Sequence, residues 1–187
     1  MDTYSRRNFM NKTGITLAGV STALVLPVGK EAKAQPMPQN AMMGENGAAP
    51  DAAKFGQSLT GVGISLLVSD VSKAVEFSTK ILKASTMYSD DSFAIMRHDK
   101  DVWMLHFDGT YHSNPLLGLV EGQDGRGRGV ELRLYNQDPD QAEAGAIENG
   151  YKVLFESRDK PHGLRECYIL DPDGYCWVLS RALREGE

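Results

Sequence analysis

Three side chains that can do chemistry alternate along the segment 130–136, VELRLYN. Glu131, Arg133 and Tyr135 are two residues apart, so in a β-strand they share one face. A carboxylate, a guanidinium and a phenol on one face can hold a polar ligand through charge and hydrogen bonds. Glu131 and Arg133 can equally form an ion pair that serves the fold alone. The pattern therefore predicts either a ligand-binding strand or a structural ion pair.

The two cysteines of the chain, Cys167 and Cys176, flank a turn with the sequence DPDG at 171–174. A pairing of Leu170 with Tyr175 across this turn predicts that both cysteines lie on one face of a hairpin, in diagonal positions. Diagonal Cβ atoms are usually farther apart than the roughly 4 Å that a disulfide prefers, so two free thiols are the favoured interpretation. Neither cysteine has a dedicated base in the sequence that would make it a nucleophile.

The elements that must position these groups form an internal repeat. A strand is expected over 61–69, and a helix over 71–82, where apolar residues recur at helical spacing after the capping residue Asp70. The other expected elements are strands over 86–89, 92–98 and 102–107, then a strand over 130–136, a helix from Asp138 to Glu148, and strands over 151–156, 165–170 and 175–181. Two copies of a strand–helix–strand–strand–strand unit predict an α+β domain.

A loop over 108–129 with six glycines separates the two units. It is longer than a simple connection, which is typical of lids and binding loops. The short basic stretch 126–128 inside it is expected to be a solvated part of the loop. His112 in this loop and His162 near the last hairpin are expected to be surface residues.

Residues 1–34 have the three parts of an export signal. The pair Arg6 and Arg7 precedes an apolar run over 13–28 that is too weak and too short for a good membrane span. The sequence Ala-Lys-Ala at 32–34 then offers a cleavage site. This segment resembles a twin-arginine signal peptide, and it predicts export of the folded protein by the twin-arginine translocase to the periplasm or the extracellular space.

The segment 35–57 is rich in Pro, Gly, Ala, Asn and Gln and has no periodicity, so it is expected to be a disordered linker before a domain over 58–187. No cysteine directly follows the cleavage site, where residue 35 is a glutamine, and a lipid anchor or other stable membrane anchor is therefore not expected. The formal net charge of -5 argues against a nucleic-acid partner, because phosphate binding needs a basic face.

The residues from 61 to about 183 resemble the vicinal oxygen chelate superfamily, which includes glyoxalase I, extradiol dioxygenases, fosfomycin-resistance enzymes and bleomycin-binding proteins. The resemblance is carried by LLVSDVSKAVEFSTKIL at 66–82, GVELRLYNQDPDQAEAGAIENG at 129–150 and GLRECYILDPDGYCWVLS at 163–180. It implies a glyoxalase-like fold, in which two βαβββ units form an open, barrel-like mixed sheet around a central cavity that holds the ligand.

Metal-dependent members of this superfamily hold a divalent ion with side chains from the first and last strands of each unit. In this chain the corresponding positions hold Gly63, Met104, Glu131 and Val178. Only Glu131 can bind a hard cation, whereas a catalytic ion normally has three or four protein ligands. The expectation is therefore a chain without a metal or other cofactor. A divalent metal ion stays as the alternative, with His106 and His112 as further ligands.

The resemblance also implies which side chains line the cavity, through strand alternation. The candidate ligand-binding residues are Ser65, Met104, His106, Glu131, Arg133, Tyr135, Cys176 and Val178. Leu67, Val102, Cys167, Ile169 and Ser180 are expected on the same faces, and Tyr168, Leu170, Trp177 and Leu179 are expected to pack against the helices. An apolar surface with a few convergent polar groups is typical of a small-molecule site.

The favoured function is that of an exported glyoxalase- or bleomycin-resistance-like protein that binds a small organic ligand without a metal. The alternative is an enzyme of the superfamily, a lyase, isomerase or dioxygenase, that uses a non-standard metal site or Glu131 and His106 as an acid/base pair. His106 is interpreted first as a hydrogen-bonded lining residue. A third interpretation is a protein that sequesters a cationic drug of the bleomycin type. Paired units of this kind also suggest a homodimer.

Overall fold

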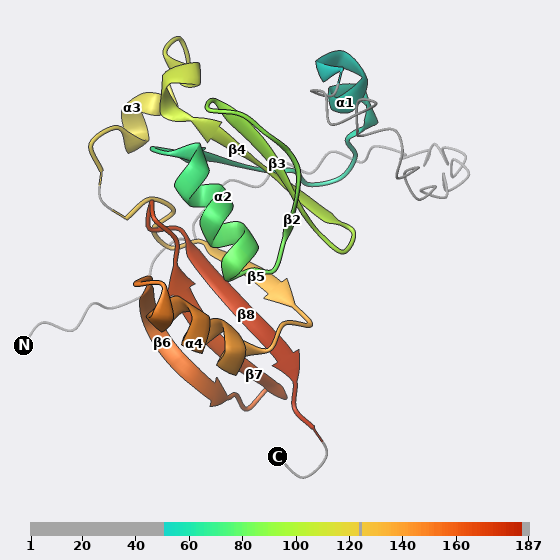
Figure 1. The fold of residues 1–187 in the computed structure, drawn as a ribbon, viewed down its shortest axis with the longest axis vertical. Helices are drawn as coiled ribbons and strands as arrows, with labels where there is room; N and C mark the ends of the chain where they lie inside the picture. The colour runs from blue at the N-terminus through green and yellow to red at the C-terminus, as the bar shows by residue number, and fades with distance from the viewer. Residues whose placement is uncertain (1–50, 124, 185–187) are drawn as a thin grey trace, which may run out of the picture. The chain divides into compact units, whose positions relative to one another are not determined.

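The repeated pattern of the sequence becomes two similar units in the computed structural model, which describes residues 51–123 and 125–184 (Figure 1). The first unit consists of β1 (Ile64–Val68), α2 (Val71–Lys80), β2 (Ser85–Ser89), β3 (Phe93–His98) and β4 (Asp101–Phe107). The second unit consists of β5 (Glu131–Tyr135), α4 (Pro139–Glu148), β6 (Lys152–Asp159), β7 (Leu164–Leu170) and β8 (Cys176–Ala182). The predicted α+β architecture of two βαβββ units is confirmed.

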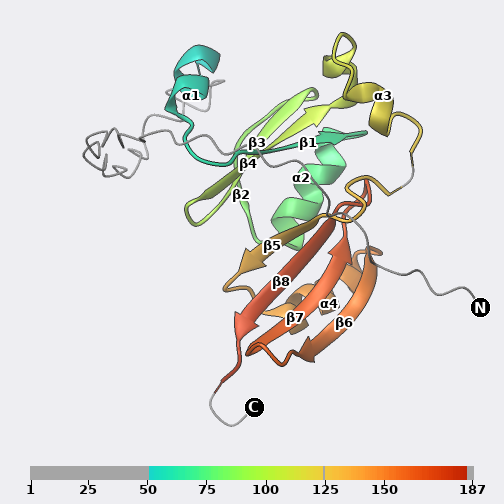
Figure 2. The same ribbon diagram turned by 180° about the vertical axis from the view of Figure 1, so that it is seen from behind.

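Each unit forms one four-stranded mixed sheet, as Figure 2 shows from behind. Sheet A has the strand order β1-β4-β3-β2, and sheet B has the order β5-β8-β7-β6. In each sheet the first strand of the unit pairs in parallel with the last, and the other pairs are antiparallel. The two sheets are separate and do not close into a barrel.

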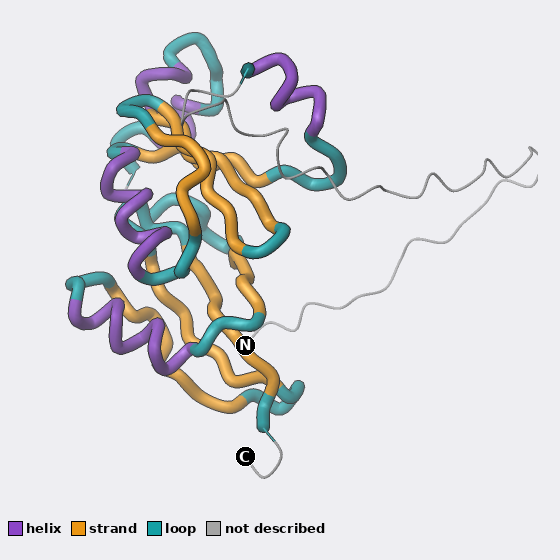
Figure 3. Tube along the Cα trace, turned by 45° about the vertical axis from the view of Figure 1, so that its right-hand side comes forward, coloured by secondary structure: helices purple, strands orange, loops and turns teal. Residues whose placement is uncertain are grey.

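A helix covers one face of each sheet (Figure 3). Helix α2 begins where the Asp70 side chain accepts a hydrogen bond from the Lys73 amide, and α4 begins at Asp138 in the same way. These caps satisfy amide groups that have no partner inside the helix. The face of each sheet turned away from its helix is called its open face here.

The helix-facing sides of the two sheets belong to one hydrophobic core. Trp103 of β4 and Trp177 of β8 are in contact with 5.3 Å between their ring centroids, and Phe77 of α2 meets Tyr151 edge-on at 5.0 Å. Because large aromatic rings from both units pack against each other, burial of these rings stabilises the two units together.

The connection between the units contains the 3-10 helix η3 (Asp108–Tyr111) and the short helix α3 (Leu117–Val120). A further helix, α1 (Ala52–Ser58), precedes the first unit, so the expectation of a disordered linker is wrong for residues 52–57. The Asp51 side chain caps α1, and Phe55 is buried. The predicted signal peptide and the rest of the linker lie outside the described residues. Among the described residues no helix is long and apolar enough to cross a membrane.

The hairpin between β7 and β8 differs from the prediction by one residue. Leu170 pairs with Cys176, not with Tyr175. The Asp171 amide donates to the carbonyl of Tyr175 at 3.0 Å, so five residues rather than four form the turn. A shift of one residue exchanges the two faces of a strand. Cys167 and Ile169 therefore pack against α4 in the core. The open face receives Glu166, Tyr168 and Leu170, and the predicted packing of Tyr168 and Leu170 against the helix is wrong.

The same shift separates the cysteines, which lie on opposite faces of sheet B. Both are free thiols, as expected, but because they face apart and not because they are diagonal neighbours. Burial raises the pKa of Cys167 to about 12. The thiolate form that reacts as a nucleophile is therefore strongly disfavoured at this position.

Candidate functional site

The open face of sheet B carries most of the predicted site residues. In the parallel pairing of β5 with β8, Glu131 lies beside Cys176, Arg133 beside Val178, and Tyr135 beside Ser180. The predicted face of β5 and β8 is therefore present as expected. Sequence reasoning missed Glu166 and Tyr168, which β7 adds to it opposite Ser180 and Val178. A turn of five residues, if it had been assumed, would have placed Glu166 and Tyr168 on this face, because the length of the turn fixes the register of β7 against β8.

Glu166, which pairs with Ser180 of β8, is fully buried. Its carboxylate accepts a hydrogen bond from the Arg133 guanidinium and one from the Tyr168 hydroxyl at 3.3 Å. The Nε2 atom of His162 lies 3.0 Å from the same carboxylate. His162 is thus more than a surface residue, although its side chain is 56% exposed. A buried carboxylate with three polar partners is well compensated for its loss of water.

The charge state of Glu166 follows from these partners. Burial alone would raise the pKa of its carboxyl, but the hydrogen bond from His162 and the positive charge of Arg133 outweigh burial, and the pKa is lowered. Glu166 is therefore ionised at neutral pH, and it holds Arg133 in place by charge.

Arg133 bridges two carboxylates. It donates to Glu131 at 2.8 Å as well as to Glu166, and its guanidinium lies 5.9 Å from the centroid of the Tyr135 ring. Burial would lower the pKa of Arg133, but the hydrogen bond to Glu131 and the other nearby acceptors raise it above its ordinary value. The ion pair considered in the sequence analysis is present, and it extends from the half-exposed Glu131 to the buried Glu166.

The open face of sheet A is mostly apolar. Ser65 pairs with Met104 and Leu67 with His106, so these four residues share one face, and Val102, two residues before Met104 in β4, lies on the same face as predicted. The His106 ring packs against Phe93 at 4.7 Å and against Tyr111 at 5.2 Å.

Burial lowers the pKa of His106, so its ring is neutral at pH 7. The proposed acid/base pair is not assembled here, because Glu131 contacts Arg133 on sheet B while His106 packs against aromatic rings on sheet A.

The residues present do not fit the divalent ion that the sequence resemblance implies. The four positions expected to bind it, Gly63, Met104, Glu131 and Val178, supply one carboxylate, that of Glu131, and it is already paired with Arg133. Val178 is fully buried and has no donor atom. Within residues 51–123 and 125–184, no three His, Cys, Asp or Glu side chains are grouped as metal ligands. His112, the further candidate from the loop, is exposed and has the Gly109 carbonyl as its neighbour.

The glycine-rich loop is fixed to both units by Arg126, which is buried, so the expectation of a solvated basic stretch is wrong for this residue. Its guanidinium makes two hydrogen bonds with Asp108, at 2.8 and 2.7 Å, and donates to the carbonyl of Leu67 at 2.8 Å. The Asp173 side chain lies 3.6 Å from the Arg126 Nε atom and accepts from the Ser69 amide at 2.9 Å. These contacts join the end of β1, the loop and the DPDG turn.

Close backbone packing between the loop and the turn requires glycine. Gly174 has a φ of +86°, and a Cβ atom there would lie 2.4 Å from the Cα atom of Gly125. A Cβ atom on Gly127 would lie 2.5 Å from the Tyr175 ring. The turn is therefore a docking point for the loop as well as a connection between two strands.

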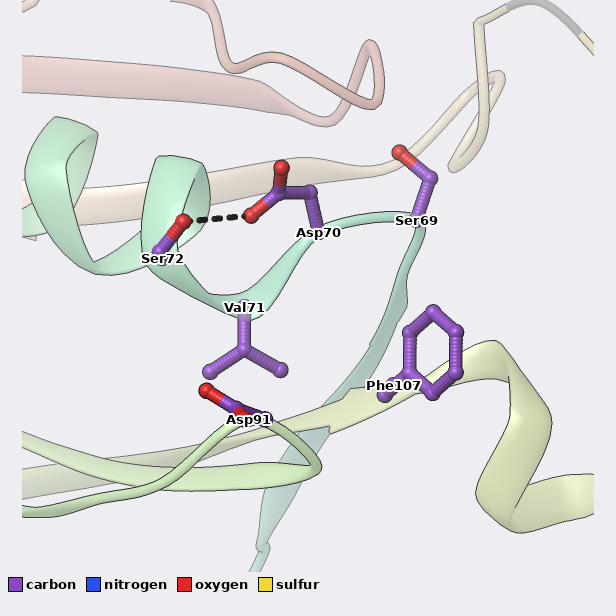
Figure 4. Close-up of a pocket in the computed structure, with 6 residues that line it drawn as sticks. All are labelled: Ser69, Asp70, Val71, Ser72, Asp91 and Phe107. Atoms are coloured by element: carbon purple, nitrogen blue, oxygen red, sulfur yellow. Dashed lines mark hydrogen bonds between the residues drawn. The ribbon is translucent and has the colours of Figure 1, made fainter.

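A pocket of about 260 Å³ lies at the start of α2 (Figure 4). Its lining consists of Ser69, Asp70, Val71, Ser72, Asp91 and Phe107. The Ser72 hydroxyl donates to Asp70 at 2.7 Å, so the capping residue already uses part of its carboxylate. This pocket contains none of the predicted ligand-binding residues, which lie on the open faces of the sheets.

Comparison with solved structures finds the same fold in several proteins. A glyoxalase/bleomycin resistance protein/dioxygenase from Nocardioides is 20% identical, with 72% of this chain and 94% of that chain covered and a TM-score of 0.51. A family enzyme of the same description from Burkholderia phytofirmans PsJN is 13% identical, with 64% and 96% covered and a TM-score of 0.55. A glyoxalase-related enzyme from Fulvimarina pelagi is 16% identical, with 66% and 88% covered and a TM-score of 0.54.

At these low identities the three matches establish a shared fold and no more, and they confirm the glyoxalase-like fold expected from the sequence. No model of a protein family matches the chain, and no curated protein matches it either.

Proposed function

We propose that this chain is a member of the vicinal oxygen chelate superfamily that binds a small organic ligand on the open face of sheet B without the usual metal. The arrangement of Glu131, Arg133 and Glu166 is the observation that carries this proposal. The Arg133 guanidinium donates hydrogen bonds to both carboxylates on this face, and such a network of polar groups supports the proposal of a polar ligand.

The division between buried and accessible groups supports a binding role. Glu166 is fully buried and holds Arg133, whereas the Glu131 side chain is 46% exposed and Tyr135 is 53% exposed. A site binds more tightly when buried partners hold its contact groups in one conformation before the ligand arrives. The accessible oxygen atoms of Glu131 and Tyr135 suit a ligand with hydroxyl or amine donors.

The chemistry of the donor set supports binding without a metal. A single carboxylate, already neutralised by Arg133, is a poor start for a site that needs three or four ligands. In this proposal the guanidinium takes the place of the ion as the positive centre of the face.

Export by the twin-arginine translocase is part of the same proposal and rests on the sequence of residues 1–34. It implies a ligand met in the periplasm or outside the cell. The homodimer stays a prediction.

A thermal-shift screen of small organic compounds against the mature protein tests the binding role. At least one polar compound class should raise the melting temperature of the wild type, because a ligand that binds only the folded state stabilises it. Glu131→Gln should lose that shift, while the control Glu148→Gln at the end of α4 should keep it. Compounds that stabilise the two variants equally would contradict a site at Glu131.

Metal analysis of the purified protein tests the metal-free part of the proposal. Mn, Fe, Ni and Zn should each be well below one equivalent. A stoichiometric ion that is lost in Glu131→Ala would overturn the metal-free proposal and favour the metalloenzyme alternative.

A further inference from the structure

Helix α1 covers an apolar part of the open face of sheet A. Phe55 is 6% exposed and forms a small hydrophobic cluster with the buried Met87 and Ile95. The partly buried residues packed against this cluster are Tyr88, Phe93, Val102 and Met104. None of these side chains carries a charge, so the surface beneath Phe55 is the chemical opposite of the ionised face of sheet B.

One side chain holds α1 to the sheet. Phe55 is the single buried residue of Ala52–Ser58. The hydrogen bonds that the structure shows for this helix join residues of the segment 51–59 to one another. A helix of seven residues is also far too short to be stable on its own in water.

The chain that follows α1 allows it to move. Residues 59–63 are exposed, and Gly61 and Gly63 lie among them, with Gly61 at a φ of +76°. A segment with few buried contacts opens at low free-energy cost compared with the core.

We infer that the surface beneath Phe55 is a binding site for an uncharged aromatic group, and that α1 is its displaceable cover. The inference rests on the proposed function and gives the class of ligand group that sheet A accepts. The Phe55 ring shows that a six-membered ring fits against Met87 and Ile95. The sulfur atoms of Met87 and Met104 suit such a ring, since thioethers make favourable contacts with aromatic groups.

The cover weakens binding by competition. A ligand reaches the surface only in the fraction of molecules whose α1 has moved, and its apparent affinity falls by that fraction. Removal of the Phe55 ring therefore strengthens binding, whereas loss of a merely structural contact has no such effect.

Titration of the full chain with the uncharged dye N-phenyl-1-naphthylamine tests the inference through its fluorescence. Phe55→Ala should bind one equivalent of dye at least about tenfold more tightly than the wild type, because the open fraction approaches one. The control Lys54→Ala on the exposed side of the same helix should bind as the wild type does. Phe55→Ala combined with Val102→Phe should lose the gain, because the added ring fills the vacated space.

Equal affinity of Phe55→Ala and the wild type, with both folded by circular dichroism, would overturn the inference, as would a gain that survives Val102→Phe. Hydrogen exchange provides a second test that uses only the wild type, so it does not depend on the stability of a variant. Saturating dye should speed the exchange of the amides of residues 52–58, because dye binding displaces α1. Unchanged exchange with the dye bound would refute this displacement.

Glu131→Gln separates this inference from the proposed function. It lies on sheet B, so it should leave dye binding unchanged even if it abolishes the polar-ligand shift. If a polar compound raises the melting temperature but Phe55→Ala does not bind the dye more tightly, the inference about α1 is refuted and the proposed function stands. If Phe55→Ala binds the dye more tightly but no polar compound raises the melting temperature, the polar site is refuted and the inference about α1 stands.

Discussion

The guanidinium of Arg133 on β5 forms an ion pair with the carboxylate of Glu166 on β7, and the Glu166 side chain is only 1% exposed. The two strands are not neighbours in sheet B, because β8 lies between them. The pair therefore crosses β8 on the open face, where Arg133 lies beside Val178 and Glu166 beside Ser180, and both of these β8 residues are fully buried. Val178, which the sequence resemblance aligns with a metal ligand, therefore lies next to an ion pair.

Arg133→Met should destabilise the protein strongly, since it leaves the Glu166 charge buried with only His162 and Tyr168 as partners. Breaking a buried ion pair on one side costs about 3–5 kcal/mol, and the remaining partners reduce this to roughly 2–3 kcal/mol. Urea unfolding at pH 7 measures the change. Arg133→Met with Glu166→Met should recover much of the loss, and a single-variant effect of less than about 0.5 kcal/mol would show that the pair is unimportant.

Acid should remove the stability that Glu166 contributes. Its pKa is lower in the folded state than the ordinary glutamate value of 4.5, so the folded state binds fewer protons than the unfolded state. The contribution is complete above pH 4.5 and is lost as the pH falls through the folded pKa. Unfolding free energies measured from pH 6 to pH 3 should decline less steeply in Glu166→Gln than in the wild type. Parallel curves would indicate that the pKa of Glu166 is the same in both states.

Arg126→Met should cost far more than Arg128→Met. Arg126 is buried with two hydrogen bonds to Asp108, whereas Arg128 is exposed and donates to the Gly125 carbonyl. Loss of the buried guanidinium leaves Asp108 and Asp173 without their cation, at a cost of roughly 2–4 kcal/mol. Chemical denaturation of both variants checks this, and similar small losses would argue against a buried tie.

Gly174→Ala should be more harmful than Gly150→Ala, although both glycines have positive φ. A Cβ atom at Gly174 meets the Gly125 backbone at 2.4 Å, whereas a Cβ atom at Gly150 has nothing within 4 Å. Gly150→Ala should cost about 1 kcal/mol for its backbone conformation alone, and Gly174→Ala should exceed it by 1 kcal/mol or more. Equal melting temperatures would show that the loop gives way without cost.

The sequence was sufficient where local chemistry decides the structure. Asp70 and Asp138 cap helices through amides two or three residues away, so both helices were predicted near their observed starts. The shared face of Glu131, Arg133 and Tyr135 follows from alternation within one strand and needs no knowledge of a partner.

Prediction failed where contacts with residues distant in the sequence determine the burial or orientation of a side chain. Glu166 was missed because the face of β7 depends on how many residues the DPDG turn contains. Arg126 is buried only because Asp108, Leu67 and Asp173 meet around it. Phe55 gives no periodic signal in a segment rich in small residues, and its partners lie on β2 and β3.

The matched registers of the two sheets have a consequence for how such a chain can diversify. Ser65 and Arg133 each lie five residues before a helix cap and pair with Met104 and Val178, so they occupy the same backbone position in two copies of one unit. Around this position the first unit has a mostly apolar surface, whereas the second unit has a charged one. A duplicated scaffold thus lets each copy change its chemistry while the other keeps its own, and a ligand with both an aromatic and a polar end would match that division.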